Sequence, residues 1–372
     1  MIASNARRST DHVTWLTKPA LLGMTVLTIL CLAPSAHCAD EPIVPANATL
    51  EKLFEGQVLT EGVAVGHDGL VYFSDITFSH KGLGPHGEIQ AGHIWRFDPR
   101  TSKTEIFRSP SGMSNGIKFD AAGNMLVCEG ADYGGRRVTR TDMKTGMSWI
   151  LAGLYEGRPL NSPNDVTIDE QGRIYFSDPR YLGHEPIDQP LAAVYRRDPD
   201  GSLTRIITDI GKPNGVCVSP DQRSLYVVSN DNGTTAIGRM SSGAAGPAGQ
   251  ADKVSAPLHK GQMTLMAYDL HENGTATLRK TLVDYAPFDG PDGLVCDTAG
   301  NLVVAVRAEN RPGIYFYSPA GKELDYLKTE VPTNVGFGRG DDANLLYITA
   351  GKSLYRVRLN CHGYQLPKPA TR

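Results

Sequence analysis

The chain has 372 residues, a formal net charge of −3, and a composition that is 40% hydrophobic and 21% charged. These values are typical of a globular protein and argue against nucleic acid as a partner, because nucleic-acid binding favours a basic surface. The length suits one large domain or two ordinary ones, and 40 glycines and 24 prolines make the chain rich in turns.

The first 38 residues are predicted to be a signal peptide and not part of the fold. Basic residues, among them Arg7 and Lys18, precede an apolar stretch over residues 20–32, and small residues follow up to Ala39. The apolar stretch is too short to cross a bilayer, which needs about 20 residues. We therefore expect an exported protein, periplasmic or secreted, without membrane contact after cleavage; an uncleaved anchor and a misassigned start are the alternatives.

The rest of the chain divides into a linker, one domain and a tail. Residues 39–48 contain two prolines and little periodicity, and are predicted to be a linker. The sequence over 49–59 alternates enough for a strand, which we expect to become the outer strand of the last repeat and so to cover a sheet edge. The domain is predicted to span 49–360, with a flexible insertion at 231–262 and a C-terminal tail at 361–372.

Within that domain, one short pattern occurs six times: a polar residue opens an apolar run, and in four cases a glycine follows eight positions later. A second apolar run comes next, so each repeat predicts a strand, a tight turn and a strand. Repeats of about 50 residues, each a small sheet, predict an all-β fold, a six-bladed β-propeller. The opening polar residues are Glu61, Asn115, Asn164, Asn214, Asp292 and Asn334.

The opening polar residue is predicted to lie on the buried face of its strand. Because side chains alternate along a strand, Glu61 shares a face with the apolar Val63 and Val65. A buried polar group without a partner costs about 1–3 kcal/mol, and a charge costs more. Six blades closed around an axis bring their innermost strands together, so the six polar residues are predicted to line a central channel as a ring.

Two carboxylates and four amides that face one another need a cation or water between them. Oxygen ligands alone suit a hard cation such as Ca²⁺ or Mg²⁺, with Mn²⁺ as an alternative, and the ring lacks the His and Cys of a structural zinc site. The sequence therefore predicts a metal ion in the channel. The alternative is a ring of side chains that only satisfy the strand ends.

Several segments resemble the gluconolactonase family, which includes regucalcin (the senescence marker protein) and, more distantly, diisopropylfluorophosphatase. The likeness covers about residues 50–360 and is carried by Arg158-Pro-Leu-Asn-Ser-Pro-Asn-Asp-Val, Tyr175-Phe-Ser-Asp-Pro, Lys212-Pro-Asn-Gly-Val and Pro291-Asp-Gly-Leu. It implies a six-bladed propeller with one divalent metal ion in the channel. The ligands that it implies are Glu61, Asn164, Asn214 and Asp292.

The resemblance also implies hydrolysis of a sugar lactone to the aldonic acid by metal-activated water, hence a carboxylic ester hydrolase with a small-molecule lactone as its partner. Asp292 is expected to be catalytic as the general base, with a role as nucleophile or as a ligand only left open. Ca²⁺ is the expected ion, and Mg²⁺, Mn²⁺ and Zn²⁺ are the alternatives. Asn115 and Asn334 are expected to bind substrate or water.

The chain departs from the family where substrate is bound. Many gluconolactonases have a Cys-Glu-His-Gly-Gly-Arg-Arg run, whereas this chain has Cys128-Glu-Gly-Ala-Asp-Tyr-Gly-Gly-Arg-Arg, and regucalcin has an arginine where this chain has Ser162. We therefore expect a different substrate orientation, with contacts from Ser162 and Tyr133. Further candidates for the pocket wall are Asp132, His80, His86, Arg136 and Arg307.

Two other functions are left open by the sequence. One is a promiscuous esterase or phosphotriesterase on the same metal centre, and the other is a non-catalytic propeller with a structural ion that binds a sugar or a protein. An enzyme is favoured because two carboxylates and two amides leave coordination positions for water and substrate. The sequence does not decide between a monomer and a dimer.

Four cysteines would remain after cleavage, and none forms a Cys-x-x-Cys pair. Cys128, Cys217 and Cys296 fall inside predicted strands of three blades, so free buried thiols are expected. Export would also permit a disulfide, but the sequence does not give its pairing.

Overall fold

The structure, a computed structural model, describes residues 41–81, 84–233 and 260–367. The predicted signal peptide and nearly all of the insertion predicted at 231–262 lie outside these residues. The described part is built of β-strands, with two short 3₁₀ turns, η1 (Ser79–Lys81) and η3 (Gly340–Asp342). Within it, no helix has the length and apolarity that a membrane span requires.

Six four-stranded antiparallel sheets form the blades, which confirms the predicted six-bladed β-propeller. Blade 1 contains β2 (Thr60–Val65), β3 (Val71–Asp75), β4 (His93–Asp98) and β5 (Lys103–Arg108). Blade 2 contains β6 (Ser114–Phe119), β7 (Met125–Glu129), β8 (Arg137–Thr141) and β9 (Ser148–Ala152). Blade 3 contains β12 (Val166–Ile168), β13 (Ile174–Asp178), β14 (Ala193–Arg197) and β15 (Leu203–Ile207).

The second half of the chain repeats the same layout. Blade 4 contains β16 (Pro213–Val218), β17 (Ser224–Asn230), β18 (Met263–Leu270) and β19 (Ala276–Asp284). Blade 5 contains β20 (Pro291–Cys296), β21 (Leu302–Val306), β22 (Gly313–Tyr317) and β23 (Glu323–Lys328). Blade 6 contains β24 (Pro332–Phe337), β25 (Leu345–Ala350), β26 (Ser353–Arg358) and β1 (Glu51–Glu55). A small hairpin of β10 (Leu154–Tyr155) and β11 (Arg158–Pro159) connects blades 2 and 3.

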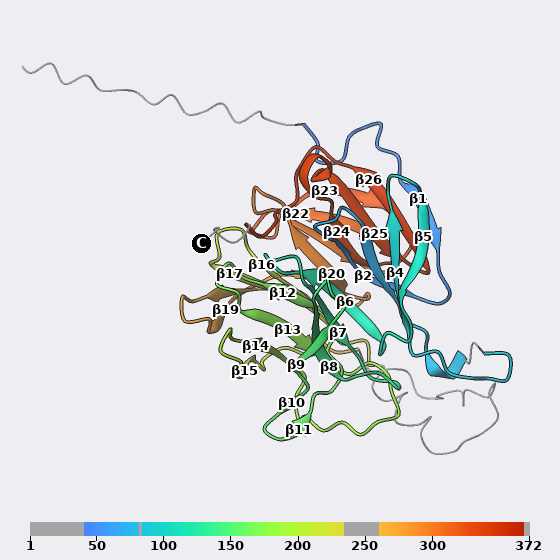
Figure 1. The fold of residues 1–372 in the computed structure, drawn as a ribbon. Coiled ribbons are helices and arrows are strands. Elements are labelled where there is room, and N and C mark those ends of the chain that lie inside the picture. The colour runs from blue at the N-terminus through green and yellow to red at the C-terminus, as the bar shows by residue number, and fades with distance from the viewer. Residues whose placement is uncertain (1–40, 82–83, 234–259, 368–372) are drawn as a thin grey trace, which may run out of the picture. The chain divides into compact units, whose positions relative to one another are not determined.

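The ring of blades closes through β1. The strand expected over 49–59 pairs antiparallel with β26, with Glu51 opposite Arg356, and completes blade 6. The inner strands contact one another in the order β2, β6, β12, β16, β20, β24 and back to β2. In Figure 1, β1 (blue) and β26 (red) are found in the same sheet, so the two ends of the domain meet there.

The hydrophobic core lies between the blades. Each of six clusters of buried side chains joins two successive blades. Between blades 1 and 2, for example, Ala64 and Tyr72 pack with Ile117 and Val127. Both faces of a blade are therefore buried, which explains why the second strands are continuous apolar runs rather than alternating ones. This packing holds the six inner strands at fixed positions around the channel.

A β-bulge interrupts the inner strand next to the ring residue. In β2, Glu61 pairs with Ser74 and Ala64 pairs with Tyr72, so three steps along β2 match two steps along β3. The inner strands β6, β16 and β20 have register shifts at the corresponding place, whereas in β24 the shift lies between Pro332 and Asn334, before the ring residue. The prediction that Glu61 shares a face with Val63 is therefore wrong. It assumed strict alternation along β2, whereas the bulge adds one residue between Glu61 and Ala64 and changes the direction of the Glu61 side chain.

Candidate functional site

Five of the six predicted ring residues line one cavity. These five residues are 5–8% exposed, and the cavity has a volume of about 250 Å³. Ser162, predicted to contact substrate, lines it as well. The ring residues on the cavity wall are Glu61, Asn115, Asn164, Asn214 and Asp292. The channel position predicted from the repeat thus brings oxygen-bearing side chains from five blades to one place.

A glycine follows the ring residue in four blades because the next inner strand lies directly against it. A Cβ on Gly62 would overlap the carbonyl oxygen of Asn115, and a Cβ on Gly293 would overlap the side chain of Asn334. The glycines after the ring residues of blades 2 and 4 are equally confined. Gly62 also has a φ of +56°, which a side chain would disfavour. These glycines let the inner strands approach closely enough to form the ring.

Serines of the second strands fix the backbone of the ring. Ser74 Oγ of β3 donates to the carbonyl of Asn115 at 2.8 Å, and Ser177 Oγ of β13 donates to that of Asn214 at 2.6 Å. Both serines belong to a Tyr-Phe-Ser-Asp segment. The aspartate of each segment accepts backbone N–H groups from the residues that lead into the inner strand of its own blade. One four-residue segment therefore supports two neighbouring ring positions.

Among the described residues that line the cavity, the two ring carboxylates of Glu61 and Asp292 have a single guanidinium beside them, that of Arg307. Burial raises the pKa of Glu61 well above its usual range, and the charge of Asp292 raises it further. Burial also raises the pKa of Asp292; Arg307 opposes this shift, and the buried Asp165 adds to it. Arg307 Nη1 donates to Asp292 Oδ2 at 3.1 Å. A further positive charge at this place would relieve the repulsion between the two ring carboxylates.

The donor atoms fit a hard divalent cation. Glu61 and Asp292 supply carboxylate oxygens, and Asn164 and Asn214 supply amide oxygens. The Asn214 amide is already oriented, because its Nδ2 donates to Tyr181 Oη at 3.1 Å and Oδ1 is left as the ligand atom. An all-oxygen set that is crowded with negative charge suits Ca²⁺, Mg²⁺ or Mn²⁺.

Tyr181 is a site residue that sequence reasoning missed. It lines the cavity, and its ring lies 5.2 Å from the Lys212 ammonium. Burial, and then the charge of Asp292, raises the pKa of Tyr181 well above its usual value, so the hydroxyl keeps its proton. Tyr181 follows shortly after a Tyr-Phe-Ser-Asp segment in the sequence, but only the loop that returns it to the channel reveals its role.

Two predicted substrate contacts, Asn334 and Tyr133, are not among the described residues that line the cavity. Asn334 Oδ1 instead accepts the backbone N–H of Val335 at 2.8 Å. The Tyr133 ring is 54% exposed and packs on His184, with ring centroids 4.1 Å apart. Of the other residues predicted for the pocket wall, Asp132 and Arg307 line the cavity, whereas His80, His86 and Arg136 do not.

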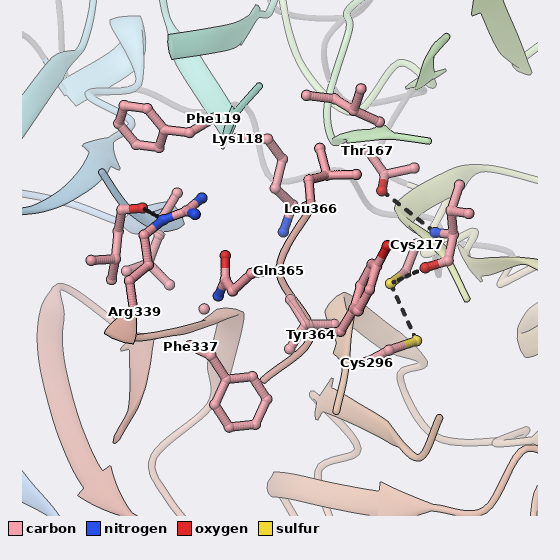
Figure 2. Close-up of a pocket in the computed structure, with 17 residues that line it drawn as sticks. Lys118, Phe119, Thr167, Cys217, Cys296, Phe337, Arg339, Tyr364, Gln365 and Leu366 are labelled. Carbon is pink, nitrogen blue, oxygen red and sulfur yellow. Dashed lines mark hydrogen bonds between the residues drawn. The ribbon is translucent and has the colours of Figure 1, made fainter. Parts of the chain in front are cut away.

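A smaller cavity lies further along the inner strands (Figure 2). Its volume is about 100 Å³, and its lining includes Lys118, Thr167 and Cys217, each three positions beyond a ring residue. Among the described residues, no Asp or Glu lines it, so it lacks the ligands that a hard cation prefers. Cys217 and Cys296 are free thiols there, with their Sγ atoms 3.4 Å apart.

The segment that the sequence assigned to a tail borders this smaller cavity. Tyr364 N donates to the carbonyl of Cys296 at 3.0 Å, and Tyr364 Oη donates to Glu170 Oε1 at 2.7 Å. Gln365 Nε2 donates to the carbonyl of Gly338 at 3.2 Å. Residues 361–367 therefore contact blades 3, 5 and 6 at this end of the channel, where Figure 2 shows Tyr364 and Gln365 on opposite sides of their segment.

Fold and ring together define a six-bladed propeller with an oxygen-lined cavity in its channel. The family model described as SMP-30/Gluconolactonase/LRE-like region matches residues 59–256 and 259–352. The chain therefore belongs to this family, which confirms the resemblance found in its sequence.

Individual relatives support the same family. The chain is 29% identical over 273 residues to a gluconolactonase of Zymomonas mobilis, with 69% of this chain and 65% of the relative covered. It is 26% identical over 268 residues to the pentonolactonase XacC of Haloferax volcanii, with 70% and 75% covered. The chain thus spans less than two thirds of the length of the Zymomonas relative.

Solved structures show the same fold. A gluconolactonase of Xanthomonas campestris aligns with a TM-score of 0.66 at 23% identity, covering 86% of this chain and 95% of the other. A calcium-binding protein of Agrobacterium tumefaciens, regucalcin, aligns with a TM-score of 0.61 at 18% identity, covering 86% and 96%. At these identities the likeness concerns the fold alone.

Proposed function

We propose that this protein is a hydrolase that opens the ring of a lactone in the larger cavity, with a divalent cation as cofactor. The observation that carries the proposal is the buried pair of carboxylates, Glu61 and Asp292, which faces a cavity of about 250 Å³ beside two amides. Relatives named gluconolactonase and pentonolactonase support it. The sugar lactone expected from the sequence is one member of this substrate class.

Four residues would hold the cation: Glu61, Asn164, Asn214 and Asp292. A cation bound there supplies a Lewis acid that polarises the lactone carbonyl. We propose Ca²⁺ first, because carboxylate and amide oxygens are its preferred ligands and the Agrobacterium neighbour is described as calcium-binding. Mg²⁺, Mn²⁺ and Zn²⁺ are the alternatives.

Asp292 is proposed as the general base. Its Oδ2 accepts a hydrogen bond from Arg307, so Oδ1 would be the ligand atom for the cation and would accept the proton of an attacking water through its second lone pair. Tyr181 keeps its own proton while it accepts the hydrogen bond from Asn214, so its O–H can be donated to the carbonyl oxygen as negative charge develops. Arg307 stabilises the carboxylate form of Asp292 between turnovers.

Hydrolysis of glucono-δ-lactone and δ-valerolactone, followed by proton release, tests the proposal. The protein is assayed with a chelator and then with each of the four cations restored. Asp292→Asn is expected to lower kcat by about 10²–10⁴-fold, whereas Asp200→Asn, on the surface, should leave it unchanged. Full turnover by the Asp292 variant, or equal rates with and without chelator, would overturn the mechanism.

We also propose that the protein is exported, to the periplasm or the medium. The support is the basic, apolar and small-residue pattern of residues 1–38. Cell fractionation with N-terminal sequencing of the recovered protein tests this. An intact N-terminus in the cytoplasmic fraction would contradict export.

A further inference from the structure

We propose that the substrate is a lactone that carries an apolar arm, alkyl or aryl, rather than a polyhydroxylated sugar lactone. This inference rests on the lactone hydrolysis proposed above and names the substrate class of the same cavity. It comes from the contrast between the ring residues, which are polar, and the loops beside them, which contribute six apolar side chains to the cavity lining.

The wall is built of apolar side chains from the loops next to the ring. They come from blades 1, 2 and 3, either just before an inner strand or just after a second strand, which is the end of each blade where the ring lies. Several of them keep part of their surface exposed, so folding alone has not buried it. The apolar wall residues are Leu59, Ile76, Phe78, Met113, Ala131 and Leu182.

Two hydrogen bonds made by the next residue in the chain hold Phe78 in this wall. Ser79, the residue after Phe78, donates to both carboxylate oxygens of Asp132. Its N–H donates to Oδ2 at 2.8 Å and its Oγ donates to Oδ1 at 2.6 Å. The loop that carries Phe78 is therefore fixed by blade 2. A preformed apolar wall of this kind favours an apolar ligand, because contact removes its surface from water without ordering the loop.

Two polar side chains that line the cavity beside the apolar residues already have partners within the protein. The carboxylate of Asp132 is committed to Ser79, and Ser162 Oγ accepts Ala131 N at 3.0 Å. A sugar lactone presents several hydroxyls, and each one that enters the wall region without a partner costs free energy. The wall therefore discriminates against a substrate that is polar all around its ring.

One acceptor on the cavity lining is unpartnered. Asn230 Nδ2 donates to the carbonyls of Gly290 and Pro291 at 3.3 and 3.2 Å, but its buried Oδ1 has no hydrogen-bond partner. This oxygen is itself buried and is not open to the cavity, so it takes no part in selecting the substrate. The substrate that fits this cavity is thus a lactone with an apolar arm and not a polyol.

A homologous series of lactones tests the inference on the metal-loaded full chain. The series is δ-valerolactone, δ-hexalactone, δ-octalactone and δ-decalactone, with glucono-δ-lactone as the sugar member. Each methylene that the wall covers should raise kcat/KM about three- to fourfold, until the arm extends beyond the cavity. We expect δ-octalactone to be hydrolysed with a higher kcat/KM than glucono-δ-lactone.

Two variants place the effect in the wall. Phe78→Ser and Leu182→Ser should each lower the ratio of kcat/KM for δ-octalactone over glucono-δ-lactone about tenfold or more. Ile106→Ser is the matched control, because Ile106 is 50% exposed on β5, outside the cavity lining, and its loss should leave the ratio unchanged. Binding of 2-alkylcyclohexanones, which have the arm but no ester, gives a second readout by thermal shift.

The outcomes separate the inference from the proposed function. If kcat/KM does not depend on the length of the arm, or is highest for glucono-δ-lactone, the inference is overturned while lactone hydrolysis stands. If no lactone is hydrolysed and ketone binding also ignores the arm, both are overturned. An unchanged ratio in the Phe78 and Leu182 variants would likewise refute the role of this wall.

Discussion

Replacing Tyr181 by phenylalanine should weaken cation binding at the ring although no ligand is altered. Asn214 Nδ2 donates to Tyr181 Oη at 3.1 Å, and this bond decides which atom of the amide is left for the cation. Without Oη, a hydrogen bond of about 1 kcal/mol is lost and the amide is held less firmly in its orientation. Groups that orient a metal ligand typically contribute about 10–100-fold in affinity. We expect binding to weaken about tenfold, which is about 1.4 kcal/mol.

Calorimetric titration with Ca²⁺, repeated with Mg²⁺ and Mn²⁺, measures this change. Tyr285→Phe is the matched control, because Tyr285 Oη donates to Tyr317 Oη at 3.1 Å and neither tyrosine lines the cavity within the described residues. The control should bind the cation as the unaltered protein does. Unaltered affinity in a folded Tyr181→Phe variant would refute the idea that this hydroxyl orients a ligand.

Three further predictions concern stability and the free thiols. Gly62→Ala should destabilise the fold by about 2–5 kcal/mol, because alanine at φ +56° costs about 1–2 kcal/mol and its Cβ would press on the backbone of blade 2. Gly69→Ala, at φ +77° with open space around the added Cβ, should be destabilised only by the backbone cost of about 1–2 kcal/mol. Equal losses of unfolding free energy for the two variants in urea would contradict the close approach of the blades. Burial lowers the pKa of His93, so the unfolded chain takes up the proton first as the pH falls, and the stability present above about pH 6.5 is lost below it. The fall in Tm between about pH 7.5 and 5.5 should therefore be smaller in His93→Gln, and an identical fall in both proteins would argue against this. Glutathione disulfide should oxidise Cys217 and Cys296, whose Sγ atoms are 3.4 Å apart, to a disulfide with loss of two hydrogens. Intact mass with Cys217→Ser as the control detects it, and a folded protein that keeps both thiols under oxidation would count against the pair.

The blades and the ring could be predicted because one pattern recurs around a closed circle. Each repeat folds into the same strand, turn and strand, so equivalent positions such as Glu61 and Asp292 meet at the axis although they are far apart in the chain. The outer strand over 49–59 could be predicted for the same reason, since a circle of sheets leaves one edge that needs a partner.

The remaining features depend on contacts between blades, which a repeat period does not contain. The bulge after Glu61 becomes visible only when β2 is aligned with β3. Tyr181 reaches the cavity through a loop whose course is set by its neighbours, and Tyr133 packs on His184 instead of the cavity for the same reason. Local sequence therefore predicted which strands carry the site and three of the residues beside them, Asp132, Ser162 and Arg307, but not Tyr181.

The pairing of β1 with β26 has a consequence for the order of folding. Because one sheet joins the first and the last strands of the domain, blade 6 cannot be completed until the chain has been synthesised to residue 358. Pairings of such long sequence separation form slowly, since the entropy of closing the chain is lost before the contact is gained. Until then the ring remains open and the domain incomplete. The first strand of the domain therefore stays unpaired until the last one is made, and the C-terminal strand β26 sets the moment at which the ring closes.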